Sequence, residues 1–149
     1  MSSTKHSSYQ TSVDVLATEL NALTAGSDSA ISGAGTGVIL DNSVGLNLYC
    51  DFEFISGGAW GVARSGSLKV SLYFSVAADG VNYTDAGSAF DRAQESWYFD
   101  ATVTTRRLIV RNIEIPPGKV KCYVNNGCGV AMPAVNNIVR AWPHFVTVL

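Results

Sequence analysis

Apolar and polar residues alternate along two stretches of this chain, and the alternation predicts β-strands. In the stretch 68–76 the apolar positions are Leu68, Val70, Leu72, Phe74 and Val76. In the stretch from about 44 to 55 they are Leu46, Leu48, Cys50, Phe52 and Phe54. Successive side chains of a strand point to opposite faces, so each stretch predicts a strand with one buried face. Such strands are typical of antiparallel sheets that pack on a second layer.

Further strands are predicted at 96–100, 104–115, 119–125 and 138–148. Turn residues separate them: Asp79-Gly80 predicts a turn after strand 68–76, and Pro116-Pro117-Gly118 ends strand 104–115 because proline cannot donate to a ladder. Strand 104–115 carries apolar residues on both faces, which indicates either a central strand or a bulge. Pro143, inside the last strand, indicates an edge strand or a bulge.

The first part of the chain has a different pattern. Residues 1–12 are polar, show no periodicity and are expected to form an arm. In 13–24, apolar residues recur at spacings of three and four, which predicts a short helix. Ser12 is a candidate N-cap and Gly26 a candidate C-terminal stop. The sequence therefore predicts one all-β domain over 13–149, an antiparallel, jelly-roll-like β-sandwich with one short N-terminal helix and a polar N-terminal arm.

Composition agrees with one globular domain. The 149 residues are 47% hydrophobic and 15% charged, a balance that disordered chains do not have. The net charge of -2 argues against nucleic-acid binding, which needs clustered Lys and Arg. No apolar run approaches the roughly 18 residues of a membrane span, so no membrane partner is expected. The polar stretch 1–12 lacks the apolar centre of a signal peptide, and folding in the cytosol, the cytoplasm of the producing cell, is expected.

The residues that most often bind metals are few and scattered. Cys50, Cys122 and Cys128 are an odd number of thiols, and Cys50 and Cys122 fall on the apolar faces of their strands. They are therefore expected to be free thiols that pack in the core. His6 and His144, the only histidines, are far apart in the sequence. No metal site and no cofactor are expected.

Asp51 and Glu53 are the candidate catalytic residues because they point the same way from one strand. Paired carboxylates can act as acid and base on glycosides. On the polar face of a strand, however, a solvated pair is the ordinary outcome, and no nucleophile motif is found elsewhere. The sequence therefore favours a protein that is not an enzyme.

Tyr49, Tyr73 and Tyr123 lie on the polar faces of strong strands and are candidate contact residues. Tyrosine is enriched at protein interfaces, and exposed aromatic rings also stack on sugars. The plainer alternative is an exposed tyrosine or one paired with its cross-strand neighbour.

Several segments of the chain follow one another in a specific order. ATELNAL precedes LNLYCDFEF, which is followed by LYFSVAADGVNYTD, TRRLIVRNIEIPPGKVKCYVNNGCGVAMPA and NNIVRAWPH. In this order, which spans nearly the whole chain, the sequence resembles a family of small virion proteins of tailed bacteriophages. The loop GGAWGVARSGS departs most from the family pattern.

The resemblance implies a capsid decoration (cement) protein with a jelly-roll or β-sandwich fold and no catalytic residues. Such a protein binds the outside of the icosahedral head of the virion as an oligomer and stabilises it. Its expected partners are the major capsid protein and copies of itself, in a dimer or trimer. The arm could order along a neighbouring subunit, with Lys5, His6 and Tyr9 as contact residues.

Two alternatives remain open at the level of sequence. The first is a tail-fibre or spike domain that binds a host-surface glycan through the three tyrosines. The second is a glycan-cleaving enzyme, which depends on Asp51 and Glu53 alone.

Overall fold

The computed structural model describes residues 5–77, 81–84, 86–89 and 91–148. Its strands are β1 (Lys5–Tyr9), β2 (Val13–Leu16), β3 (Leu40–Asp41), β4 (Tyr49–Ile55), β5 (Lys69–Val76), β6 (Glu95–Tyr98), β7 (Arg107–Glu114), β8 (Lys119–Asn126) and β9 (Ile138–Val148). A single 3-10 turn, Thr18–Leu20, lies between β2 and β3. The predicted Asp79-Gly80 turn lies outside the described residues.

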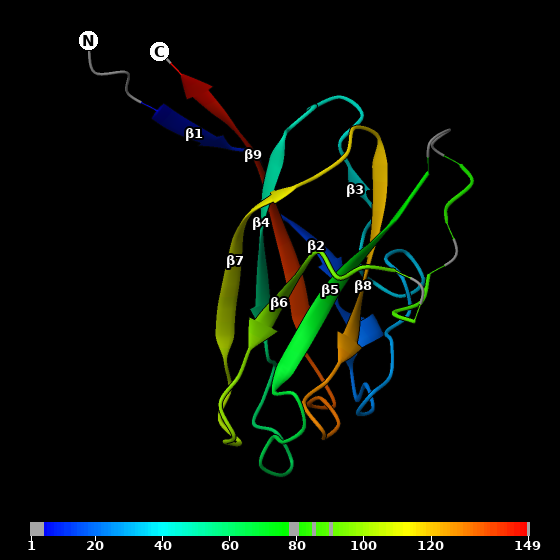
Figure 1. The fold of residues 1–149 in the computed structure, drawn as a ribbon, viewed down its shortest axis with the longest axis vertical. Helices are drawn as coiled ribbons and strands as arrows, with labels where there is room; N and C mark the ends of the chain where they lie inside the picture. The colour runs from blue at the N-terminus through cyan, green and yellow to red at the C-terminus, as the bar shows by residue number, and fades with distance from the viewer. Residues whose placement is uncertain (1–4, 78–80, 85, 90, 149) are drawn as a thin grey trace.

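The strands form two antiparallel sheets (Figure 1). In the first sheet β9 lies between β4 and the pair β1 and β2, and β7 forms the other edge. The second sheet has the order β3-β8-β5-β6. The prediction of an all-β, antiparallel, β-sandwich-like protein is therefore confirmed.

The core lies between the two sheets and contains most of the apolar residues that the alternation predicts. Leu46 and Leu48, which precede β4, and Val76, at the end of β5, are exposed instead. Cys50, Phe52 and Phe54 of β4 are fully buried there with residues of β5 and β8. Rings of Phe52 and Phe74 lie 5.5 Å apart, and the indole of Trp97 donates a hydrogen bond of 3.1 Å to the carbonyl of Phe52. Cys50 and Cys122 are buried free thiols, as predicted, and so is Cys128.

A bulge in β7 explains the apolar residues on both of its faces. Cys50 pairs with Ile113 and Phe52 with Val110, so β7 holds one residue more than β4 across this interval. Asn112 lies in the bulge with φ of 55°. Because the extra residue reverses the alternation, Leu108 and Val110 before the bulge and Ile113 after it all pack against the core. Of the two alternatives for this strand, the bulge is confirmed; β7 is an edge strand, not a central one.

Pro143 lies within a central strand, because β9 pairs on both sides. β1 pairs with β9 as far as His144, and β2 begins opposite Ala141. The carbonyl of Pro143 accepts from the N–H of Gln10 at 2.8 Å, so its imide nitrogen faces the gap between β1 and β2. Proline is tolerated here because no partner strand requires a donor.

The helix predicted over 13–24 is wrong. Val13–Leu16 pair with β9 as a strand, and only Thr18–Leu20 turn as a 3-10 helix. The apolar residues of this segment are nevertheless buried, namely Val15, Leu16 and Leu20. A strand followed by a tight turn can, like a helix, direct apolar residues three or four positions apart towards the core. Tertiary pairing with β9 outweighs the weak helical preference of this short segment.

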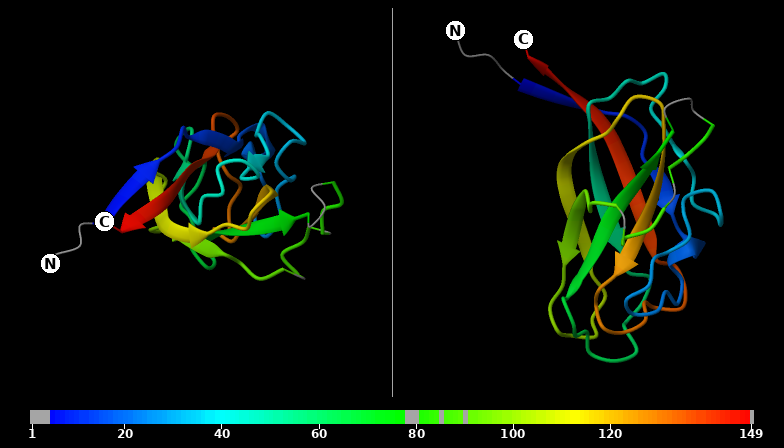
Figure 2. Two further views of the ribbon diagram at one scale, coloured as in Figure 1. Left: turned by 90° about the horizontal axis from the view of Figure 1, so that it is seen from above. Right: turned by 45° about the vertical axis from the view of Figure 1, so that its right-hand side comes forward.

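The polar arm also contains a strand. β1 pairs with the C-terminal part of β9 in a register that runs from Lys5 opposite Val148 to Tyr9 opposite His144. Beyond His144, β9 pairs with no other strand of the described chain. These two strands extend beyond the sheets (Figures 1 and 2). We refer to Lys5–Tyr9 and His144–Val148 as the β1–β9 ribbon.

Candidate functional site

A buried polar network lies where the β1–β9 ribbon meets the first sheet. The hydroxyl of Tyr9, the last residue of β1, donates a hydrogen bond of 2.9 Å to Oδ2 of Asp51 on β4. Oδ1 of Asp51 accepts from the N–H of Asn112, in the β7 bulge, at 2.8 Å. Asp51 is only 2% exposed, so these partners satisfy a carboxylate that water does not reach. The network thus joins β1, β4 and β7.

His144 forms the other half of this junction. Its imidazole is fully buried and lies 4.8 Å from the ring of Tyr9 and 6.1 Å from that of Tyr49. Its Nε2 is 3.1 Å from Oδ1 of Asn112, and its Nδ1 is 3.2 Å from the carbonyl of Trp142. The hydrogen bond to Asp51, with burial, raises the pKa of Tyr9, so its hydroxyl remains a donor. Both strands of the ribbon are therefore fixed to the sheet at their bases.

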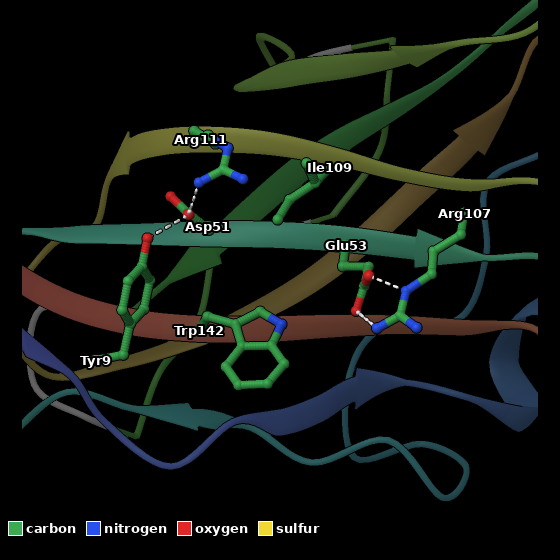
Figure 3. Close-up of a pocket in the computed structure, with 7 residues that line it drawn as sticks. All are labelled: Tyr9, Asp51, Glu53, Arg107, Ile109, Arg111 and Trp142. Carbon is green, nitrogen blue, oxygen red and sulfur yellow. Dashed lines mark hydrogen bonds and ion pairs between the residues drawn. The ribbon is translucent and has the colours of Figure 1, made fainter.

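An open pocket of about 450 Å³ lies beside this junction, on the outer face of the first sheet (Figure 3). It is lined by Tyr9, Asp51, Glu53, Arg107, Ile109, Arg111 and Trp142. β4 supplies the carboxylates, and its neighbours β9 and β7 supply Trp142 and Ile109 on either side. The pocket therefore combines an apolar surface with buried charge.

Each carboxylate of the pocket is paired with an arginine of β7. Arg107 donates to Glu53 through two nitrogens, with 3.1 Å between Nη2 and Oε2. The Glu53 carboxylate raises the pKa of Arg107. Arg111 lies 3.6 Å from Asp51. The two negative and two positive side chains cancel, so the lining has no net charge.

The structure overturns the expectation of a solvated Asp51–Glu53 pair. Both carboxylates are buried, because Tyr9 and the side chains of β7 cover this part of the sheet. Sequence patterning places a residue on a face of a strand but does not show which neighbouring strand covers that face. Burial of Asp51 and Glu53 could not be predicted without knowing that β4 pairs with β7 and that the end of β1 lies beside Asp51.

The predicted tyrosine surface is divided between the two sheets. Tyr49 lies in the first sheet beside His144, whereas Tyr73 and Tyr123 stack at 5.0 Å in the second. Tyr123 is fully buried: its hydroxyl donates to Asp91 at 2.5 Å and accepts from the N–H of Gly87 at 3.0 Å. The segment before β6 thus covers this pair, and the expectation that Tyr73 and Tyr123 are exposed contact residues is wrong.

Of the arm residues, Tyr9 has a described role at the base of the ribbon. Lys5 and His6 lie on β1 opposite Val148 and Thr147. Their side chains lie outside the described part of the structure, so their contacts remain a prediction.

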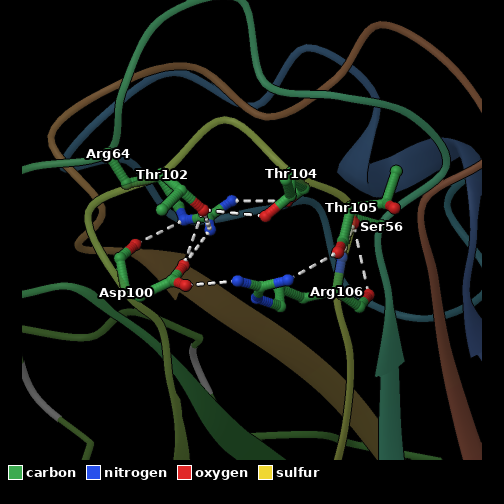
Figure 4. A network of polar contacts seen from close by, with 7 residues as sticks. All are labelled: Ser56, Arg64, Asp100, Thr102, Thr104, Thr105 and Arg106. Carbon is green, nitrogen blue, oxygen red and sulfur yellow. Dashed lines mark hydrogen bonds and ion pairs between the residues drawn. The ribbon is translucent and has the colours of Figure 1, made fainter.

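A second polar network was not predicted from the sequence (Figure 4). Arg64, in the loop between β4 and β5, has a fully buried side chain. It donates to the carboxylate and the carbonyl of Asp100 at 2.5 and 2.9 Å and to the carbonyl of Thr104 at 3.0 Å. Its guanidinium also lies over the rings of Trp60 and Phe99. A lone arginine in a glycine-rich stretch gives no sequence signal of such burial.

No protein-family model, curated protein or solved structure matches this chain. Within the described residues, no group of three or more His, Cys, Asp or Glu side chains is arranged to bind a metal. In the same part of the chain, no helix has the length and apolar character needed to cross a membrane.

Proposed function

We propose that this protein is a non-enzymatic structural protein that assembles with copies of itself and decorates the head of a tailed bacteriophage. The observation that supports assembly is the β1–β9 ribbon, which extends beyond both sheets (Figure 2). Its partner would be the major capsid protein, and its place the outer surface of the virion. This second part of the proposal depends on the sequence resemblance in 17–144.

The ribbon is suited to association with another subunit. Two paired strands without a second layer are only marginally stable in water. β1 is the edge of its sheet, and in the described chain β9 beyond His144 has β1 as its only partner strand. Both edges of the ribbon thus offer backbone donors and acceptors to a further strand. A neighbouring subunit that paired with either edge would cover the ribbon.

Rigid attachment of the ribbon also supports an assembly role. Tyr9, His144 and Asn112 fix its base through the buried network around Asp51. A fixed direction lowers the entropy that is lost when a neighbouring subunit is bound.

The finer fold proposal is a jelly roll, an architecture found in viral capsid proteins and lectins. A jelly roll is one long antiparallel hairpin of strand pairs that is wrapped into two sheets. β2 pairs with β9, β3 with β8, β4 with β7 and β5 with β6, which is the order of such a hairpin. This order supports the jelly-roll assignment, and by analogy alone a virion role.

Deletion of residues 1–12 tests the assembly part. The deletion removes β1 and leaves the paired strands of both sheets in place. We expect the full-length protein to sediment as a dimer or trimer in analytical ultracentrifugation, and the truncated protein as a monomer. The matched control is Tyr98→Ala, which removes an exposed aromatic ring from β6 in the second sheet and leaves the ribbon unchanged; it should associate like the wild type. Equal association of the full-length and truncated proteins would contradict the role of the ribbon.

The head location is tested by the composition of purified virus particles. Quantitative mass spectrometry should give a copy number of this chain comparable with that of the major capsid protein. A copy number equal to that of tail proteins would instead select the tail-fibre or spike alternative.

A further inference from the structure

We propose that the pocket on the outer face of the first sheet binds an uncharged carbohydrate, with one pyranose ring packed against Trp142. This inference does not depend on where the protein is located or on how it assembles. It is based on the apolar surface, the arrangement of donors and acceptors, and the charge of the pocket (Figure 3).

The apolar surface has the form of a short slot. Trp142 pairs across the strands with Asp51, and Ile109 pairs with Glu53, so the two apolar side chains flank β4 from opposite sides. Trp142 is half-buried, and Ile109 is 43% exposed on an edge strand. A flat ring with C–H groups on its faces can enter between them and bury apolar area against the indole. A volume of about 450 Å³ accommodates a small sugar.

Polar groups at both ends of the slot match the hydroxyls of a sugar. Neighbouring hydroxyls each donate and accept, and they are best bound by a donor beside an acceptor. Arg107 beside Glu53 gives this arrangement at one end. At the other end Arg111 supplies exposed donors, while Asp51 is already satisfied by Tyr9 and Asn112. The side chain of Arg107 is 65% exposed, and its bonds to Glu53 use only Nε and Nη2 of a group with five N–H donors. Further donors are therefore accessible from solvent.

The charge of the lining disfavours ionic ligands. Asp51 and Glu53 are neutralised by Arg107 and Arg111, and Arg140 on the same face is paired with Asp14. An anion at these arginines would lie close to a carboxylate, and a cation at the carboxylates would lie close to an arginine, so neither gains a net attraction from the lining. An uncharged polyol can add hydrogen bonds without displacing either ion pair.

Ligand-observed NMR on the full-length protein tests this proposal. The probes are the methyl glycosides of glucose, galactose, mannose and N-acetylglucosamine, with N-acetylneuraminic acid as an anionic comparison. We expect saturable binding of at least one uncharged glycoside. Its Kd should change by less than about twofold between about 50 and 500 mM salt, because no net charge is neutralised.

Variants at two positions locate the binding. Trp142→Ala should weaken binding by at least about tenfold, because the stacking surface is lost. Arg107→Met should weaken it by about fivefold, the typical effect of one hydrogen bond. Because Arg107→Met leaves the buried Glu53 without its partner, Arg107→Lys, which keeps a cation beside Glu53, is the variant expected to fold if the other two do not. The matched control is Tyr98→Ala, which removes an exposed aromatic ring from β6 in the other sheet and should bind like the wild type.

Three results would overturn the proposal. The first is the absence of saturable binding of every uncharged glycoside. The second is unchanged binding by Arg107→Met together with unchanged binding by a folded Trp142→Ala. The third is an NMR signal of the Trp142 indole that shifts with protein concentration and not with sugar, which would identify the pocket as an interface between copies of this chain.

Discussion

Arg64 is the residue whose chemistry most constrains the loops at one end of the sandwich. Its buried guanidinium connects the loop after β4 to the segment between β6 and β7, through Asp100 and Thr104 (Figure 4). Asp100 itself lies near the surface, and the Arg106 guanidinium, together with Thr102 and Arg64, holds its pKa far below the usual range. A buried cation is tolerated here because protein acceptors replace its lost water.

Arg64→Met should reduce the free energy of unfolding by about 2–4 kcal/mol. The replacement keeps much of the buried volume but leaves the carbonyls of Asp100 and Thr104 without their donor. Denaturant titration followed by circular dichroism measures the loss. Arg106→Ala is the matched control: it removes the more exposed arginine from the same carboxylate and should cost less than about 1 kcal/mol. A larger loss for Arg106→Ala would contradict the importance of burial.

The burial of a side chain was predictable from the sequence only where it depends on the face of the residue's own strand. Burial of Cys50 and Cys122 follows from their parity on their own strands. Burial of Asp51 and Arg64 does not, because their partners lie on segments distant in the sequence. For the same reason the sequence predicts that Tyr123 lies on the face of its strand away from the core, but it does not predict that the segment before β6 covers this face.

At the level of elements, the bulge of β7 has the clearest role. It brings Asn112 to a position from which its N–H reaches Asp51 and its side chain reaches His144. A positive φ of 55° suits asparagine, which enters the left-handed region more readily than other residues with a Cβ. The bulge therefore connects an edge strand to the base of the ribbon.

Comparison of Asn112→Ala with Asn112→Gly separates backbone strain from the loss of the side chain. Both variants lose the contact with His144, but glycine adopts positive φ without a steric penalty. Asn112→Ala should reduce the free energy of unfolding by about 1–3 kcal/mol, and Asn112→Gly by about 1 kcal/mol less than that. Urea titration measures both. Equal losses would show that the backbone conformation at this position carries no cost.

Elements were predictable from the sequence where periodicity was long and regular. The strand predicted from about 44 to 55 corresponds to β4, which begins later, at Tyr49, and the strand predicted at 68–76 corresponds to β5. The apolar residues on both faces of 104–115 indicated the bulge as one of two alternatives. The segment 13–24 is not predictable in this way, because its spacings of three and four fit a helix whereas pairing with β9 determines its structure. A polar strand such as β1 has no apolar periodicity to reveal it.

For the whole molecule, the buried cysteine thiols predict how the free energy of unfolding depends on pH. Burial raises the pKa of the Cys128 thiol to about 11 and that of Cys122 to about 12. In the unfolded chain these thiols ionise near their usual value of about 8.5. Above that pH the unfolded state loses protons before the folded state does, so the folded state becomes less stable as pH rises towards the folded pKa values.

The free energy of unfolding should therefore fall steadily from about pH 8.5 to about pH 11. Denaturant titrations at several pH values in this window measure the slope. A Cys128→Ala variant should show a shallower slope than the wild type, because one of the ionising groups is absent. Constant or rising stability across the window in the wild type would contradict the assignment.

The class of the fold was predictable from the sequence, but the site was not. Alternation and turn residues are enough to indicate two antiparallel sheets. The pocket requires β9, β4 and β7 to be neighbours, and the ribbon requires strands near opposite ends of the sequence to pair. Neither pairing leaves a local pattern in the residues, since strand order is determined by the packing of the whole chain.

The central position of β9 has a consequence for synthesis on the ribosome. β9 follows the other strands in the sequence, yet it is the strand that joins β1 and β2 to β4. Until residues 138–148 leave the exit tunnel, β4 lacks a partner on one side, and β1 and β2 have none. Until then the segments that become β1, β2 and β4 lack the strand that pairs with them in the folded protein. Strands without their partners are prone to associate with other chains before folding is complete.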